Sequence, residues 1–490
     1  MPASALAYAQ ADVRPSGTLA QSIDAAAQRL LGISDPGPKL VALIDRALPS
    51  GVSYDSAIAP WLGPQAAVAL LDVSHTDGTL GIHGQVAVVI DQTNSDAANA
   101  AIANGALYTP SGGASPTLAH DNYRGVSYTE DVTTGTDVGV VGDYVVITTG
   151  ASGFRAVVDA VDGSDSLAAT SGFQRATNAE LPGADAVVYV PVMKLLDALA
   201  PIGVGLGGAD FMTTLKTELA DAVIAGSARF DSNGALLDLT VSGARLPTPA
   251  SQPSNPITTL PAGSWLALGA TGVGNRIATA AARLVSGTAP GPGVRWLLDW
   301  LGPVRADLAW IDTASLFAKG TNLGTLEAGV VLGMADQSHA QSIVANLQQV
   351  ARTAAAASAS ISVGPLSQAN IDSGFTINVP GVPFTFEVAA AGARVVIALG
   401  NTSLNDALSS SDRLGDSAAY ATATSALGSG IEPEAIVSLP DIVSLIDSVG
   451  VGVPARASTI LAFLSHLGTV ALGSGSDAAG EHVRIAISGT

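Results

Sequence analysis

The residues best suited to chemistry in this sequence are scattered and do not form a known catalytic pattern. The absence of cysteine excludes thiolate nucleophiles, thiolate metal ligands and disulfides. The six histidines show neither an H-x-H nor an H-x-x-x-H spacing, so no metal site is predicted. There is no G-x-S-x-G nucleophile elbow, and Asp416 or Ser417 is interpreted as a helix N-cap. The sequence therefore assigns no catalytic residue and no cofactor.

Two glycine-rich stretches invite comparison with phosphate-binding loops. Gly203–Gly208 fits G-x-G-x-x-G but follows a predicted helix, whereas the dinucleotide fingerprint follows a strand. Gly269–Asn275 does lie between a predicted strand and a predicted helix, yet it lacks the Lys-Ser/Thr of a P-loop. Helix termination and close packing explain the first stretch. An anion at the helix N-terminus stays open for the second.

The tryptophans are clustered in one part of the sequence. Trp296, Trp300 and Trp310 lie within fifteen residues of one another, and such a cluster could form a platform for a sugar or a lipid. Trp300 has a counterpart at Trp61, which favours a role for both as core residues. Trp265, Trp296 and Trp310 have no counterpart. These three are therefore the candidate ligand-binding residues.

The tryptophans belong to a sequence that contains an internal duplication. Trp61–Pro64 recurs as Trp300–Pro303, and Ala186–Pro191 corresponds to Ala435–Pro440. The order of the landmarks is the same, and their offsets drift by only about twenty residues, which indicates duplication of a whole domain. The structural signature of the repeat consists of Trp61, Gly63, Pro64, Trp300, Gly302 and Pro303.

The duplication predicts two tandem homologous domains, one over 1–243 and one over 260–490. The linker between them, 244–259, is rich in proline, which favours an extended, semi-rigid spacer. Each copy is at the large end of the usual size range of a domain and can bury its own core.

Hairpin signals dominate each copy, and helical patterns lie between them. A helix is expected over 18–32, and strands over 66–73 and 81–91 are joined through an Asp-Gly turn. The predicted fold class is α+β, with each domain a curved, mainly antiparallel sheet covered by helices on one face.

Charge and hydropathy exclude several classes of partner. The net charge is −20, so phosphate backbones and anionic lipid surfaces are repelled, and nucleic acid is not an expected partner. No uninterrupted apolar stretch of 18 residues occurs, so no transmembrane segment is expected in this chain. The N-terminus lacks a charged region followed by an apolar one, as a signal peptide would have.

Several strand and turn motifs carry a resemblance to a known family. They are Pro2–Tyr8, Trp61–Pro64, Tyr123–Val126, Gly142–Val146 and Leu181–Ala186. Together they resemble the exported bacterial domain-of-unknown-function family 3352, common in high-GC actinobacteria, over nearly the whole chain. Members typically follow a signal peptide or a single membrane anchor, so the resemblance implies an extracytoplasmic domain, with the anchor upstream of this chain. It brings no established activity and no catalytic residues.

Two main hypotheses of function follow, with a purely structural spacer in reserve. The first is a noncatalytic cell-envelope binding or scaffold module, whose partner is a small apolar or glycan ligand or an envelope protein, with the groove between the copies as one location. It predicts no cluster of titratable residues in a deep pocket. The alternative is an exported hydrolase with a site assembled from Asp, Glu, Ser or His of different loops. It predicts a nucleophile, a base and an orienting group within hydrogen-bond reach in a cleft.

Overall fold

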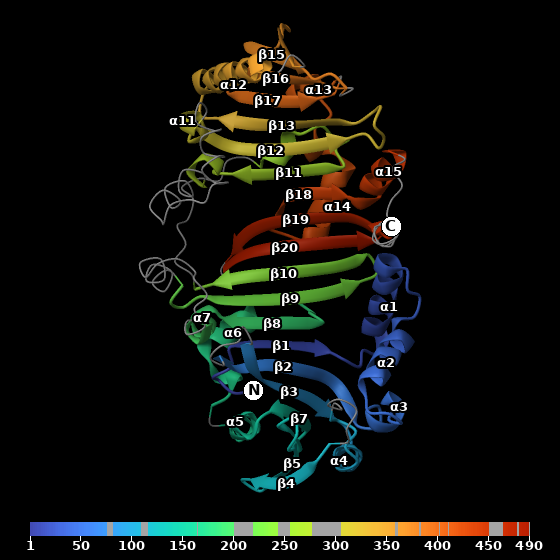
Figure 1. Ribbon diagram of the computed structural model, residues 1–490. Coiled ribbons are helices and arrows are strands. Elements are labelled where there is room, and N and C mark those ends of the chain that lie inside the picture. The colour runs from blue at the N-terminus through green and yellow to red at the C-terminus, as the bar shows by residue number, and fades with distance from the viewer. Residues whose placement is uncertain are drawn as a thin grey trace. The chain divides into compact units, whose positions relative to one another are not determined.

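The computed structural model of the chain divides into two compact units (Figure 1). Unit 1 comprises Met1–Leu246 and Ser476–Val483, and unit 2 comprises Pro247–Gly475 and Arg484–Thr490. The structure describes residues 1–75, 82–108, 116–163, 165–199, 219–243, 255–276, 305–357, 361–381, 384–400, 402–409, 411–449, 464–477 and 480–489. Helices and antiparallel strands are mixed in both units, as the α+β prediction requires.

The strands described in unit 1 pair in the order β10–β9–β8–β1–β2–β3–β7–β6–β5–β4, and every neighbouring pair is antiparallel. Their bounds are β1 (Ala7–Asp12), β2 (Leu62–His75), β3 (Ile82–Gln92), β4 (Leu118–Tyr123), β5 (Val126–Asp131), β6 (Thr136–Val141), β7 (Tyr144–Thr149), β8 (Ala186–Pro191), β9 (Val223–Asp231) and β10 (Gly234–Ser242). Short hairpins between strands adjacent in sequence make this order accessible to a chain with tight Gly-containing turns.

The helices of unit 1 pack on this sheet at different places. Helix α1 contacts β9 and β10, α4 contacts β6, and α5 contacts β3, β6 and β7. The bounds are α1 (Gly17–Leu31), α2 (Pro36–Ala47), α3 (Tyr54–Ala57), α4 (Ser95–Ala103), α5 (Ala151–Val161), the 3-10 helix η1 (Leu167–Ala169), α6 (Ser171–Asn178) and α7 (Val192–Leu199).

The sheet of unit 1 is covered on both faces around β7, so the expectation of one covered face is wrong there. Val145 and Val146 are neighbours in the strand, and both are fully buried. Successive side chains of a strand point to opposite faces. Val146 packs in a core with Phe154 of α5, whereas Val145 packs in a separate core with Trp61 and Ile102. A continuous apolar run, not an alternating one, is typical of a strand buried on both faces.

The strands described in the second half of the chain pair in the same relative order, β20–β19–β18–β11–β12–β13–β17–β16–β15–β14. Their bounds are β11 (Leu266–Thr271), β12 (Ile311–Lys319), β13 (Glu327–Met334), β14 (Ser362–Pro365), β15 (Ser373–Asn378), β16 (Thr385–Ala391), β17 (Arg394–Leu399), β18 (Glu432–Ser438), β19 (Leu467–Asp477) and β20 (Gly480–Gly489). Each strand therefore has its counterpart ten places earlier in chain order.

Helices lie between these strands in unit 2 as well. Their bounds are η3 (Pro256–Thr259), α11 (Arg305–Leu308), α12 (Gln337–Ala357), α13 (Ser403–Leu408), η5 (Leu414–Asp416), α14 (Ala418–Leu427) and α15 (Leu439–Val449). The end of the segment predicted as an extended linker is the 3-10 helix η3, in which Ile257 is fully buried. The rest of that segment, 244–254, lies outside the described residues.

Candidate functional site

An apolar cavity of about 700 Å³ opens between α1 and α2 in unit 1. We call it the α1–α2 cavity. Its main walls are Ile23, Leu30 and Leu31 of α1, Leu40 and Leu43 of α2, and Phe230 of β9. The volume lies inside the roughly 300–1,000 Å³ range of small-molecule sites. Almost all of the lining is aliphatic, so the cavity suits the hydrocarbon part of a ligand.

The local sequence explains why the two helices follow one another so closely. Gly32 ends α1 in the left-handed conformation, with φ of 66°, and its N–H donates to the carbonyl of Gln28. The next N–H, of Ile33, donates to Ala27, which returns Ile33 to the apolar side of α1. Pro36 then begins α2, since a helix tolerates proline in its first turn. Figure 1 shows α1, α2 and α3 in sequence, in blue, within unit 1.

Helix α2 carries large aliphatic side chains that the protein does not bury. The exposed fraction is 62% for Leu43, 57% for Leu40 and 48% for Leu31 of α1. No α2 residue with a described side chain is buried. Helix α1 differs, because Ala26 and Ala27 are buried. A group of exposed aliphatic side chains around a concave surface is typical of a binding site.

The charged residues of the cavity lining are both cations, Lys39 and Arg46. Neither makes an ion pair or a hydrogen bond within the part of the chain that the structure describes. The neighbouring acid Asp45 accepts a hydrogen bond from the backbone N–H of Tyr54 at 2.6 Å and does not line the cavity. The cavity is therefore an apolar hollow whose lining carries two cations and no acid, in a chain whose net charge is −20.

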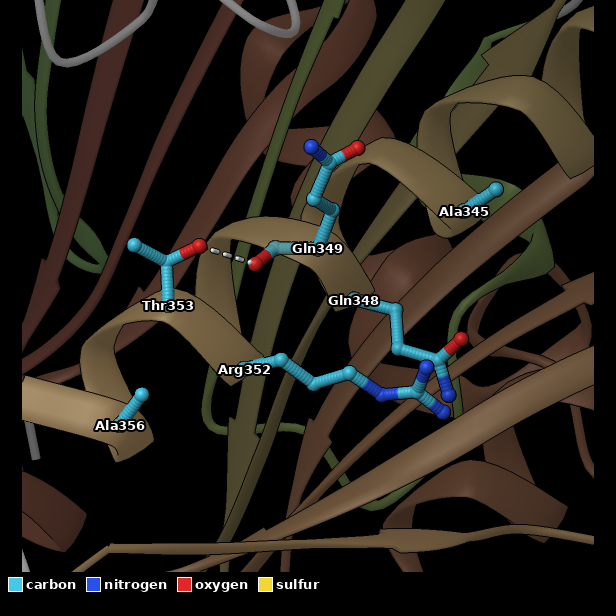
Figure 2. Close-up of a pocket in the computed structure, with 6 residues that line it drawn as sticks. All are labelled: Ala345, Gln348, Gln349, Arg352, Thr353 and Ala356. Carbon is cyan, nitrogen blue, oxygen red and sulfur yellow. Dashed lines mark hydrogen bonds between the residues drawn. The ribbon is translucent and has the colours of Figure 1, made fainter.

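A second hollow, of about 590 Å³, lies on α12 in unit 2, and Figure 2 shows the residues that line it. We call it the α12 hollow; it is lined by Ala345, Gln348, Gln349, Arg352, Thr353 and Ala356. All six belong to one helix, so no second element converges on the space. The Thr353 hydroxyl donates to the backbone carbonyl of Gln349 at 2.9 Å, a bond within the helix itself. We therefore interpret the α12 hollow as a solvated helix face.

Comparison with known proteins identifies the family. The sequence matches the family model described as "Protein of unknown function (DUF3352)" over residues 39–427. The chain belongs to this family. None of the curated proteins matches it. Among solved structures, crystal forms III and IV of TP0453 are each 11% identical to the chain. The form III match covers 51% of this chain and 82% of that one at a TM-score of 0.25, and form IV covers 49% and 80% at 0.24. Such TM-scores do not establish a shared fold.

The candidate tryptophans of this DUF3352 chain do not converge where the structure describes them. Trp265 directly precedes β11 and donates its indole N–H to the carbonyl of Gly320 at 2.8 Å. Trp310 directly precedes β12 and stacks on His339, with ring centroids 4.3 Å apart. Because β11 and β12 are antiparallel, Trp265 stands opposite Lys319, nine residues from Trp310, and the two tryptophans lie at opposite ends of the strand pair, about 30 Å apart at ~3.3 Å per residue. Trp296 lies outside the described residues, and a ligand-binding role for the three stays a prediction.

The first half of the repeat signature lies in and beside the core. Trp61 is fully buried and donates its indole N–H to the carbonyl of Ala57 at 2.6 Å. A Cβ on Gly63 would stand 2.5 Å from the Cβ of Asp91, so only glycine allows β2 to approach β3 there. Pro64 lies at a β-bulge near the start of β2, where its missing N–H is tolerated. The predicted counterparts Trp300, Gly302 and Pro303 lie outside the described residues.

Two motifs noted in the sequence, the glycines of Gly269–Asn275 and the N-cap at Ser417, have packing and capping roles in unit 2. A Cβ on Gly269 would stand 2.6 Å from Ile257, and one on Gly274 would stand 2.4 Å from the carbonyl oxygen of Ala309. These glycines therefore allow close approach of neighbouring elements. Ser417 is the N-cap of α14 and accepts a hydrogen bond from the N–H of Tyr420, as predicted. Gly203–Gly208 lies outside the described residues.

His482, which belongs to unit 1, is a buried histidine with acidic neighbours. Its Nδ1 lies 3.2 Å from Asp238 and 3.0 Å from the hydroxyl of Thr240, and its Nε2 lies 2.9 Å from Asp477. Both ring nitrogens therefore face carboxylates, and the Thr240 hydroxyl beside Nδ1 is as buried as the ring itself, so this pair is not open to a substrate as general-base catalysis requires. Within the described part of the chain, no group of three or more His, Asp or Glu side chains is arranged to hold a metal ion.

Asp137 of β6 is the described residue that comes nearest to the hydrolase alternative. It is fully buried, and neither carboxylate oxygen has a hydrogen-bond partner among the described atoms. Burial, reinforced by the charge of Glu130, raises the pKa of Asp137 to about 6. The nearby hollow lined by His120, Asp121 and Tyr128 does not include Asp137 in its lining. A perturbed acid is present, but no nucleophile is bonded to it.

Proposed function

We propose that this DUF3352 chain is a noncatalytic binding module of the cell envelope that holds an apolar ligand in the α1–α2 cavity. The observation that carries the proposal is the wall of that cavity. Leucine and isoleucine side chains of two helices and Phe230 of a strand face one space, and Leu40 and Leu43 stay more than half exposed. A ligand that covers these side chains gains the free energy of removing them from water.

The composition of the wall favours an apolar ligand over a glycan. Sugar sites combine an aromatic platform with several hydrogen-bonding groups. The α1–α2 cavity has a single aromatic side chain, Phe230, and its polar lining side chains are Lys39 and Arg46 alone. Of the candidate ligand-binding tryptophans, the two that the structure describes, Trp265 and Trp310, lie in unit 2 and apart from each other. A hydrocarbon chain fits this wall better than a row of hydroxyls.

The envelope location in this proposal is the one that the family resemblance implies. No helix within the described residues is long and apolar enough to cross a bilayer. Protease treatment of intact native cells tests the location directly. We expect added protease to degrade the protein without cell lysis, and protection until lysis would contradict the proposal.

The proposed function predicts that affinity rises with the length of the hydrocarbon chain. Burial of each methylene contributes about 0.8 kcal/mol, so each added carbon is expected to tighten binding by up to about fourfold until the cavity is full. Displacement of a fluorescent apolar probe from the full chain by octanol, decanol and dodecanol measures this series. Absence of displacement, or displacement independent of chain length, would contradict the proposal.

A further inference from the structure

We infer that the ligand of the α1–α2 cavity is a free, single-chain amphiphile with an anionic head group, which Lys39 and Arg46 bind. The inference rests on the proposed function and deepens it, because it names the charge of the ligand. Its basis is the pair of cations in an otherwise apolar lining.

The two cations are placed to act together. Lys39 and Arg46 are seven residues apart in α2, so they lie on nearly the same face of the helix, about 10 Å apart along its axis. Ala42 and Leu43, which also line the cavity, lie between them on that face. Both cationic side chains are long and exposed, so their charged ends can reach a head group at the open side while their stems stay against the apolar wall.

The structure shows no ion pair or hydrogen bond for Lys39 or Arg46 within the described residues. This contrasts with Lys319 of unit 2, which pairs with Glu327 at 2.7 Å and also with Asp406. Lysine is scarce in this sequence, with four residues in all, and acids outnumber bases 41 to 21. A cavity lining with two cations and no acid therefore differs from the acidic average of the chain, and it favours an anion.

The shape of the site favours a free amphiphile over a membrane surface. The site is a concave space of about 700 Å³ lined by two helices and a strand, so an alkyl chain lying in it would contact three elements. An amphipathic helix that binds a bilayer instead presents its apolar side outward and relies on net positive charge. This chain carries a net charge of −20, which opposes its approach to anionic lipid.

The test compares dodecanoate with dodecanol and dodecyltrimethylammonium, which share one alkyl chain and differ in head-group charge. Binding to the full chain is measured by probe displacement in the wild type and in the double variant Lys39→Gln/Arg46→Gln. The matched control, Arg29→Gln/Arg352→Gln, removes two exposed cations, one on α1 and one on α12, whose side chains do not line the cavity. Two exposed charge contacts contribute about twofold to thirtyfold in affinity.

We expect the wild type and the control to bind dodecanoate about twofold to thirtyfold more tightly than dodecanol, and the cationic ligand least tightly. We expect Lys39→Gln/Arg46→Gln to lose this preference and to keep its affinity for dodecanol. Equal binding of dodecanoate and dodecanol by the wild type would overturn the inference and leave the proposed function standing. Failure of all three ligands to bind would overturn both.

A second arm tests the membrane as the source of the anionic head group. The full chain is sedimented with vesicles of phosphatidylglycerol and with vesicles of phosphatidylcholine. We expect no greater sedimentation with the anionic vesicles. Sedimentation with phosphatidylglycerol that Lys39→Gln/Arg46→Gln abolishes, without binding of free dodecanoate, would overturn the inference in favour of a membrane-docking surface.

Discussion

The α1–α2 cavity and the α12 hollow have similar volumes, about 700 and 590 Å³, and opposite construction. The first is lined by two helices and a strand, and its wall is mainly aliphatic. The second is lined by one helix, and its residues are mainly small or polar (Figure 2). Volume alone therefore does not identify a binding site. What matters is whether side chains from separate elements face one space and leave apolar surface uncovered.

The difference has its origin in how each helix uses its apolar residues. Helix α12 buries Ile343 and Val344 in the core of unit 2, so its outer face is free to be polar. Helix α2 instead leaves its leucines, Leu40 and Leu43, exposed. In α12 the apolar face stabilises the fold, and in α2 it remains available to a ligand.

The largest expected effect is a contrast in stability between these two faces. Ile343→Ala is expected to lower the free energy of unfolding by about 2–5 kcal/mol, because it opens a cavity in a packed core. Leu43→Ala is expected to change it by less than about 0.5 kcal/mol, because the side chain is already exposed. Urea titration of both variants, followed by circular dichroism, measures the contrast. A destabilisation of more than about 2 kcal/mol by Leu43→Ala would show that α2 is part of the core.

Filling each hollow with a larger side chain is expected to change the affinity for the ligand in one case and not in the other. Ala42 of the α1–α2 cavity and Ala345 of the α12 hollow are both exposed alanines on helices. Ala42→Trp places a large ring in the cavity and should weaken binding of dodecanoate about thirtyfold or more, a loss of roughly 2 kcal/mol. Ala345→Trp is the control and should leave the affinity unchanged. Titration calorimetry measures both, and equal losses in the two variants would remove the distinction between the hollows.

Substitution of Asp137 is expected to have a smaller effect, and it tests the proposal that the protein is noncatalytic. Its pKa, raised by burial to about 6, lies above the ordinary value of 3.8 that applies in the unfolded chain. The folded state therefore binds more protons between pH 4 and 6, and stability falls as pH rises through that range. Asp137→Asn should remove this fall and raise the free energy of unfolding at pH 7 by about 1–3 kcal/mol.

Unfolding of the Asp137→Asn variant at pH 4, 5, 6 and 7 checks the sign. A structural acid predicts a stability that no longer falls over this range and unchanged ligand binding. If the wild type hydrolyses an ester, glycoside or peptide substrate and Asp137→Asn abolishes that activity, the noncatalytic account is wrong.

Local features of the fold were predictable from the sequence. Helical spacing of Leu19, Ile23 and Leu30 gave the expected helix over 18–32, which the structure has as Gly17–Leu31. The N-cap at Ser417 was predictable because serine after a turn and before an apolar run satisfies free backbone N–H groups. The continuous apolar run of Val145, Val146 and Ile147 already indicated burial on both faces, and the expectation of one covered face overlooked it.

The site itself was not predictable, because exposure is a tertiary property. The leucines of α2 have the same pattern as those of a helix packed on a core, and nothing in the sequence tells that Leu40 and Leu43 remain open. The only local signal was the placement of Lys39 and Arg46 beside them in a chain poor in lysine. The clustering of tryptophans in the sequence suggested a ligand-binding platform, yet Trp265 and Trp310 lie apart in the fold.

Native mass spectrometry of the full chain, purified without denaturant from its native host, tests the central claim most directly. The account predicts a mass above that of the bare chain, and organic extraction should release a single-chain anionic amphiphile. The excess should persist in Ala345→Trp and disappear in Ala42→Trp. A bare chain in every preparation, or an excess that Ala42→Trp retains, would contradict the assignment of the α1–α2 cavity as the binding site.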